Sequence, residues 1–295
     1  MTAVARTGAR VLLVGEVLWD EFPQSVRLGG APLNVAVQLS RLQQAPRLLS
    51  AVGTDVRGRE ATDAIAALGL DTSLVQATAQ FPTGRARVQI GPGEDTSFRI
   101  ERPAAYDAVD LSSAILDQIV QWDPEWIYYG TLFPSSPHSN NVLCRLLEAL
   151  PRATRFYDLN LRPGFDSADL VEHLLRAAHV VKLNEDELRF VHERMDLPPD
   201  AEGCCRAGAS RYGWRAAAVT LGARGCAMLV GDVFVEAPGH RVEVSDPVGA
   251  GDAFAAGFIH GLASGCPADD VATAANRLGA LAVVTAGAIP TGGRR

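Results

Sequence analysis

The sequence predicts an α/β fold in which helices cover both faces of a mostly parallel central sheet, giving three layers. Short, continuously apolar runs, typical of fully buried strands, recur along the chain, and stretches with apolar residues at helical spacing lie between them. Parallel strands need such crossover helices, and the crossovers cover both faces of the sheet. A third observation, one segment of alternating polar and apolar residues, adds a small β excursion to this body.

Strands and helices are expected in alternation from the first apolar run onward. That run, Val11–Val14, stops at Gly15 and indicates a buried strand. The stretch from Leu33 to Leu42 has helical spacing and follows the turn-forming residues 29–32. Further strands are expected at residues 48–52, 126–129, 155–158, 180–183, 217–221, 227–230 and 242–244. Further helices are expected at residues 60–68, 141–150, 170–178 and from about 251 onward.

The pattern changes between Pro82 and Pro103. Residues 85–90 and 97–101 alternate between polar and apolar side chains, and the Gly-Pro-Gly-Glu-Asp sequence between them is typical of a turn. We therefore expect a β-hairpin with one solvated face. Because no repeat and no long linker divides the chain, we expect a single domain over residues 1–295.

Composition excludes several classes of protein. The 295 residues are 47% hydrophobic and 21% charged, which is typical of a globular protein. With 27 Lys and Arg against 34 Asp and Glu, the net charge of −7 argues against binding to nucleic acid or to an acidic membrane surface. No apolar run approaches the roughly 20 residues that span a bilayer. Five cysteines without framework spacing indicate reduced thiols and a cytoplasmic location.

The most informative stretch is Asp-Pro-Val-Gly-Ala-Gly-Asp-Ala-Phe, residues 246–254, which lies between a strand-like segment and an apolar helix. A helix start leaves backbone N–H groups without partners, and Gly249 and Gly251 carry no side chain that would keep a phosphate from them. Asp252 in the first helical turn has two interpretations. It is a helix cap or dipole partner, or it is a base that takes a proton from an attacking hydroxyl.

A second pair of segments combines Gly-Glu-Val-Leu-Trp-Asp, residues 15–20, with Gly-Gly-Ala-Pro-Leu-Asn, residues 29–34. Asp20 follows the first strand at the edge of the sheet where ligands bind in open parallel sheets. Asn34, one turn into the helix, offers both a donor and an acceptor. The carboxylate and the amide suit the hydroxyls of a small polyol, while the structural alternative is a surface Asp, a flexible turn and a capping Asn.

Two later segments also follow strands. Arg162 ends the Asp-Leu-Asn-Leu-Arg sequence and could hold a phosphoryl oxygen or a sugar hydroxyl. Asn184 and Glu187 share one helix face and suit Mg²⁺ with phosphates, directly or through water, or else they form a capping box. The Gly-rich turn at residues 222–225 is neither a Walker A loop nor a Rossmann fingerprint, and by itself indicates an ordinary turn.

Together these motifs resemble the ribokinase-like (PfkB) family of carbohydrate kinases. Gly-Gly-Ala-Pro-x-Asn is similar to its N-terminal signature, and Asp-Pro-Val-Gly-Ala-Gly-Asp-Ala-Phe is similar to its C-terminal signature. The likeness runs in order from about Val11 to Ala288, and within the family it is greatest to bacterial fructokinases. The resemblance implies a ribokinase-like α/β/α sandwich with a β-sheet lid formed by residues 16–30 and 82–103. Such lids often pair between subunits, which implies a homodimer.

The resemblance also implies roles for individual residues. Asp252 would be the catalytic base, beside an anion hole formed by the backbone N–H groups of Gly249, Ala250 and Gly251. The residues implied to hold the sugar are Asp20, Gly29, Gly30, Asn34 and Arg162. The residues implied for the nucleotide are Thr220, Gly222, Gly225 and Asn276, with Asn276 beside the adenine. Asn184 and Glu187 would match an Asn-x-x-Glu element that organises Mg²⁺ and phosphate.

One position departs from the family pattern. Pro247 stands where the family usually has Thr, and proline lacks both the hydroxyl and the amide N–H. Asp246 and Val248 resemble the start of a monovalent-cation loop, so Pro247 leaves activation by K⁺ open.

These observations lead us to expect an ATP-dependent sugar kinase that uses Mg²⁺, with fructose as the first-choice acceptor. Other acceptors remain open, namely 2-keto-3-deoxygluconate, ribose, a nucleoside or a sugar phosphate. The alternative from a different class is a catalytically silent regulator that binds sugar or nucleotide on the same fold. The intact Asp252 and both glycines disfavour that alternative, because a silent protein has no need of the base.

Overall fold

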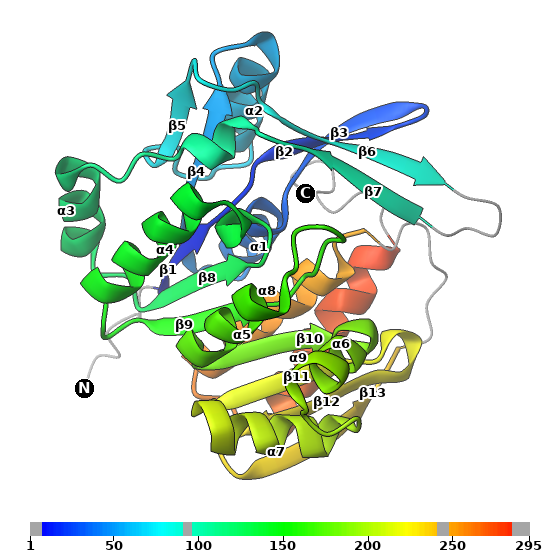
Figure 1. Ribbon diagram of the computed structural model, residues 1–295. Coiled ribbons are helices and arrows are strands. Elements are labelled where there is room, and N and C mark those ends of the chain that lie inside the picture. The colour runs from blue at the N-terminus through cyan, green and yellow to red at the C-terminus, as the bar shows by residue number, and fades with distance from the viewer. Residues whose placement is uncertain (1–7, 91–95, 241–247, 285–295) are drawn as a thin grey trace, which may run out of the picture.

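The computed structural model describes residues 8–90, 96–240 and 248–284, which form two sheets (Figure 1). In these ranges the large sheet has the strand order β13-β12-β11-β10-β9-β8-β1-β4-β5. Its strands are β1 (Arg10–Val14), β4 (Ala45–Gly53), β5 (Val75–Thr78), β8 (Trp126–Gly130), β9 (Thr154–Asp158), β10 (Val180–Asn184), β11 (Ala216–Thr220), β12 (Gly225–Val230) and β13 (Val233–Pro238). All neighbouring pairs are parallel except β11–β12 and β12–β13, which are antiparallel.

Helices cover both faces of this sheet because its strands are apolar on both sides. In β1, Leu12 and Val14 pack on one face, and Val11 and Leu13 on the other, all fully buried. The first face packs against α3 (Ser113–Trp122), α4 (Pro137–Ala149), α5 (Ala168–Ala177), α6 (Glu185–Met195) and α7 (Ala201–Tyr212). The second packs against α1 (Ala31–Arg41), α2 (Val56–Ala67), α8 (Ala250–Ala263) and α9 (Ala268–Val283). The described residues also contain three short 3₁₀ helices, at Ala105–Ala108, Phe133–Ser135 and Gly222–Arg224.

The architecture confirms the α/β prediction, and the expected strands and helices lie close to the observed ones. Apolar patterning did not predict α3, α7, α9, β2, β3, β5 or β13, although the family resemblance implied lid strands within residues 16–30. Helix α7 escaped because its buried face carries the small residues Cys204, Cys205 and Gly208, which do not produce a strong apolar period. The strand expected at residues 242–244 lies outside the described residues. Within the described ranges, no helix is both long and apolar enough to cross a membrane.

The small sheet projects from one edge of the body in the order β3-β2-β6-β7 (Figure 1). It contains β2 (Leu18–Phe22), β3 (Ser25–Gly29), β6 (Gly84–Ile90) and β7 (Thr96–Glu101). Strands β6 and β7 are the hairpin expected between residues 82 and 103, with Arg85 opposite Glu101. Strands β2 and β3 come from the expected segment 16–30 and join the hairpin through the parallel pair β2–β6.

Asp55 fixes the point at which the chain enters the small sheet. Its carboxylate caps α2 by accepting the Gly58 N–H at 2.7 Å. The same carboxylate accepts the Thr83 N–H at 2.9 Å and the Thr83 hydroxyl at 2.6 Å, one residue before β6. One side chain therefore closes a helix start and anchors the base of the hairpin.

We expect Asp55→Ala to lower the free energy of unfolding by about 1–2 kcal/mol, the usual cost of a lost N-cap. Urea denaturation measures the change. Asp63→Ala, on the exposed face of the same helix, is the matched control and should be nearly neutral. Equal stability of the two variants would contradict the anchoring role of Asp55.

Candidate active site

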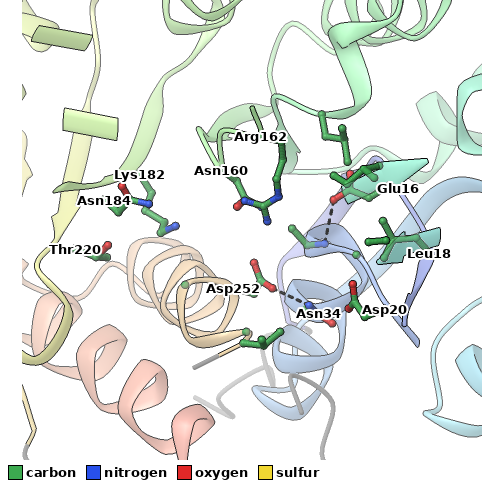
Figure 2. Close-up of a pocket in the computed structure, with 18 residues that line it drawn as sticks. Glu16, Leu18, Asp20, Asn34, Asn160, Arg162, Lys182, Asn184, Thr220 and Asp252 are labelled. Carbon is green, nitrogen blue, oxygen red and sulfur yellow. Dashed lines mark hydrogen bonds between the residues drawn. The ribbon is translucent and has the colours of Figure 1, made fainter. Parts of the chain in front are cut away.

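A cavity of about 370 Å³ opens at the carboxyl ends of the parallel strands, between the body and the small sheet (Figure 2). Open parallel sheets bind ligands at this edge. Its polar lining comes from segments that are far apart in the sequence: Glu16, Asp20, Asn34, Asn160, Arg162, Lys182, Asn184, Thr220 and Asp252. Four residues proposed from the sequence for the acceptor and its phosphorylation, Asp20, Asn34, Arg162 and Asp252, therefore lie around one space.

Asp252 and Asn34 join the first turns of two helices, α8 and α1. The Asn34 side-chain N–H donates to Asp252 Oδ2 at 2.8 Å (Figure 2). Burial, followed by the charge of Asp158, raises the pKa of Asp252 from 3.8 to about 6. The hydrogen bond from Asn34 opposes this shift, because it stabilises the ionised carboxylate. Asn34 Oδ1 is buried and accepts no hydrogen bond from the described residues, so it is available to a ligand donor.

The start of α8 places backbone N–H groups against the same cavity. Gly249 is the N-cap residue, with a φ of 87° that favours glycine. Gly249 and Gly251 line the cavity, and Ala250 is the first residue of the helix. The N–H groups of a first helical turn have no partner within the helix, and the helix dipole adds positive potential there. This arrangement suits an anion.

Glu16 and Asp20 are two further acidic residues that line the cavity. Glu16 Oε1 accepts the Ala31 N–H at 3.1 Å and so caps α1, which carries Asn34. Burial raises the pKa of both carboxyl groups to about 7, and the nearby Arg162 cation opposes the shift. Glu16 lies within the motif of residues 15–20, but no role for it was predicted from the sequence. The signal was an acidic residue placed directly after an apolar strand.

Gly29 and Gly30 make room for these two acids. A Cβ at Gly29 would overlap the Asp20 carboxylate, and one at Gly30 would overlap the Glu16 carbonyl. Gly30 also has a φ of 112°, which side-chain-bearing residues rarely adopt. Gly30 lines the cavity, whereas Gly29 is not among its lining residues. Gly29 therefore lies against the Asp20 carboxylate, just outside the set of residues that line the cavity.

Lys182 brings a buried cation to the α8 end of the cavity. Its ammonium pairs with Asp158 at 2.8 Å, and both side chains are almost fully buried. Burial alone would lower the pKa of Lys182, but the carboxylates of Asp158 and Glu187 hold it above its ordinary value. The ammonium lies 3.2 Å from the position that a Cβ on Gly251 would occupy. No role for Lys182 was predicted from the sequence, although a lysine inside the apolar strand β10 is an unusual residue in a buried position.

Asn184 and Glu187 form the capping box that was one of their two interpretations. Asn184 Oδ1 accepts the Glu187 N–H at 2.9 Å, and Glu187 Oε2 accepts the Asn184 N–H at 2.8 Å. Glu187 Oε1 accepts the Leu161 N–H at 2.9 Å. Asn184 lines the cavity, and Glu187 lies buried behind it. Because all three of these oxygens already accept backbone hydrogen bonds, the pair fits an indirect role toward a metal ion better than direct coordination.

A second cavity of about 490 Å³ lies on the other side of the α8 start. It is lined by all four residues proposed for the nucleotide, Thr220, Gly222, Gly225 and Asn276, together with Phe254 and Val283. Asn276 is buried, and its side-chain N–H donates to the Ala237 carbonyl at 3.0 Å. Thr220 and Gly251 line both cavities, which therefore meet at the helix start.

The proposed monovalent-cation loop can be followed only in part. Val248 lines the first cavity. Asp246 and Pro247 lie outside the described residues.

Known proteins resemble this chain over almost its entire length. A fructokinase from Salmonella typhimurium is 32% identical, and the alignment covers 95% of each chain. The structure of a fructokinase with bound ATP from Xylella fastidiosa matches with a TM-score of 0.83 and 25% identity, and covers 95% of each chain. A 2-dehydro-3-deoxygluconokinase from Thermotoga maritima matches with a TM-score of 0.84, covers 96% of each chain and is 17% identical, which shows the shared fold alone.

A family assignment follows from the sequence itself. The match to the family described as pfkB family carbohydrate kinase extends over residues 6–292, and this chain belongs to that family.

Proposed function

We propose that the protein is an ATP-dependent kinase of small sugars and that fructose is its acceptor. The observation that carries the proposal is the position of Asp252, half-buried in the first turn of α8 where two cavities meet. One cavity is lined by carboxylate, amide and guanidinium groups, which suit hydroxyls, and the other is mostly apolar, which suits a nucleobase. The similarity to the Salmonella fructokinase and to the ATP-bound fructokinase from Xylella supports this choice of acceptor and donor.

In this proposal the sugar binds in the first cavity with one hydroxyl at Asp252. Asp20, Asn34 and Arg162 hold the other hydroxyls, and the unused Asn34 Oδ1 accepts one of them. Gly29 and Gly30 contribute by allowing the two acids to stand close to the backbone. The small sheet closes this cavity on one side, and such a lid excludes water that would otherwise accept the phosphoryl group.

Phosphoryl transfer then needs one proton acceptor and several groups that stabilise negative charge. The ionised Asp252 takes the hydroxyl proton while the hydroxyl oxygen bonds to the γ-phosphorus, and the bond to the β-phosphate oxygen breaks to release ADP. The N–H groups of Gly249, Ala250 and Gly251 stabilise the charge on the transferred group. The Lys182 ammonium, held beside Gly251 by Asp158, adds a fixed positive charge at the same place.

ATP is proposed to lie in the second cavity, along Thr220, Gly222 and Gly225, with its base near Asn276. Asn184 lies where the two cavities approach each other, with Glu187 behind it, and the pair would organise the water shell of Mg²⁺. Mg²⁺ keeps several waters when it binds phosphates, so it needs few direct protein ligands. When bound, it would neutralise phosphate charge. A role for K⁺ near Asp246 and Val248 stays open because Pro247 replaces the usual Thr.

The proposal extends to assembly and location. Strands β3 and β7 are the edges of the small sheet, and Val26 on β3 is 41% exposed, which supports a homodimer formed through the lid. Sedimentation equilibrium measures this assembly directly. All five cysteines are free thiols, which supports a location in the reducing cytoplasm.

The first experiment is a coupled ADP-release assay with ATP and Mg²⁺ against fructose, ribose, 2-keto-3-deoxygluconate, adenosine and fructose 6-phosphate. We expect selective turnover of fructose. Selective turnover of another compound keeps the kinase mechanism and replaces the acceptor. A folded protein that binds ATP but turns over none of these compounds would favour the silent regulator instead.

Replacement of the proposed base is the sharpest test of mechanism. We expect Asp252→Asn to lower kcat by at least about 10²-fold, because an amide cannot accept the hydroxyl proton. Asp63→Asn makes the same chemical change on the exposed face of α2 and should leave kcat unchanged. Near-normal turnover by a folded Asp252→Asn variant would contradict the role of Asp252.

The pH profile should report the environment of the same carboxyl group. Asp252 acts as a base only when ionised, so kcat at saturating sugar should fall as the pH drops through about 6, the raised pKa of this group. Burial raises the pKa of the nearby Asp20 to about 7. The Asp20→Asn variant should therefore keep the acidic limb, although its KM for sugar rises. If the Asp20→Asn variant no longer showed the fall in kcat at acidic pH, that fall would be due to Asp20 or to Asp20 and Asp252 titrating together.

A further inference from the structure

Arg102 lies at the base of the small sheet, one residue after β7. Its guanidinium contacts three other segments of the chain, which contain Asp107, the turn at residues 132–135 and Phe165. Its Nε donates to Asp107 Oδ2 at 3.0 Å, and its Nη2 pairs with the other oxygen of the same carboxylate. Its Nη1 donates to the Leu132 carbonyl at 2.7 Å and also contacts the Ser135 hydroxyl. The Arg102 side chain is 10% exposed and that of Asp107 is 7% exposed, so the pair is shielded from water.

Two aromatic rings enclose the same guanidinium. The Arg102 Cζ lies 5.3 Å from the ring centroid of Phe165 and 5.4 Å from that of Tyr106. Cations over aromatic faces at this separation are attracted by the ring quadrupole, more strongly when they are desolvated. Phe165 belongs to the loop after β9, so the arginine reaches a third region of the chain besides its own strand and the turn at residues 132–135.

The strand that leads into Arg102 and two of the regions that Arg102 contacts supply walls of the sugar cavity, whereas the segment with Tyr106 and Asp107 does not line it. Ile100, two residues before Arg102, lines it from the small sheet. Leu132, whose carbonyl binds Arg102, lines it from the loop after β8. Arg162, three residues before Phe165, lines it from the loop after β9. Arg102 itself is not among the lining residues.

We propose that Arg102 is a positioning residue that holds these three walls of the sugar cavity in one arrangement without touching the sugar. The Thr131 hydroxyl already joins the two loops to each other by donating to the Leu159 carbonyl. The Arg102 guanidinium adds the small sheet to that arrangement, since it extends from the end of β7 to both loops. The identification of the ligand as a sugar rests on the proposed function. The inference that Arg102 holds the three walls together does not depend on it. Arginine is required because its planar fork binds Asp107 through two nitrogens while the third reaches Leu132.

Kinetics with Arg102→Lys test the proposal. The lysine keeps a positive charge near Asp107 but cannot bind the carboxylate and the Leu132 carbonyl together, so the walls should separate. We expect KM for the sugar to rise about tenfold or more, since small misplacements of binding groups are costly. KM for ATP should stay within about twofold, because the nucleotide cavity shares none of the three walls. Arg189→Lys, on an exposed arginine of α6, is the matched control.

Two milder variants keep the test decisive if Arg102→Lys folds poorly. Ser135→Ala and Phe165→Leu each remove one contact and leave Asp107 paired, and each should raise the sugar KM by a smaller factor in the same direction. Equal increases in both KM values, or no change in either, from folded variants would show a purely structural role and overturn the proposal.

Hydrogen–deuterium exchange gives a readout that does not need a substrate. In Arg102→Lys we expect faster amide exchange at residues 131–136 and 159–165, with unchanged exchange in α9. Faster exchange confined to residues 102–108 would overturn the coupling. If the wild-type protein turns over no sugar, the proposed function fails, and the exchange result still decides whether Arg102 holds the three walls together.

Discussion

Asn34 and Asp252 are 218 residues apart in the chain, and the hydrogen bond between them joins the starts of α1 and α8. Both helices lie on the same face of the sheet, and each directs its first turn toward the carboxyl ends of the strands. Around this contact Asp20 of β2 and the preceding Glu16 line the same cavity as the first turn of α8, and the two cavities meet beside it. The carboxyl ends of parallel strands gather at one edge of a sheet, and both α1, which follows β3 of the small sheet, and α8 begin at that edge.

Burial of several carboxyl groups around so small a space has an electrostatic cost. Burial raises the pKa values of Glu16, Asp20 and Asp252 to between about 6 and about 7. Arg162 opposes the shift at all three, and Lys182 with Asn34 opposes it at Asp252. These opposing effects leave the pKa of Asp252 at about 6. The group is then mostly ionised at neutral pH and still basic enough to accept a proton, as the proposed general-base role requires.

The small sheet is anchored to the body at several points that lie outside the cavity. Asp55 holds the start of β6, Arg102 holds the end of β7, and the Trp19 indole N–H donates to the Arg57 carbonyl at 3.1 Å from β2. These contacts come from polar and charged side chains near loops, which carry no hydrophobic period. They hold the small sheet in place beside the cavity, and residues of that sheet form part of the cavity lining.

The sequence by itself determined the fold class and the segments that form the cavity. Apolar periodicity depends on local burial, and glycine and aspartate at a helix start have local conformational causes, so both are visible in the residues around Val11, Gly249 and Asp252. Only the tertiary structure decided that Lys182 stands at Gly251, that Glu16 caps α1, that Gly29 lies against Asp20 and that Arg102 joins three walls. These contacts depend on side chains brought together from distant segments, and a sequence pattern carries no record of which distant residues meet.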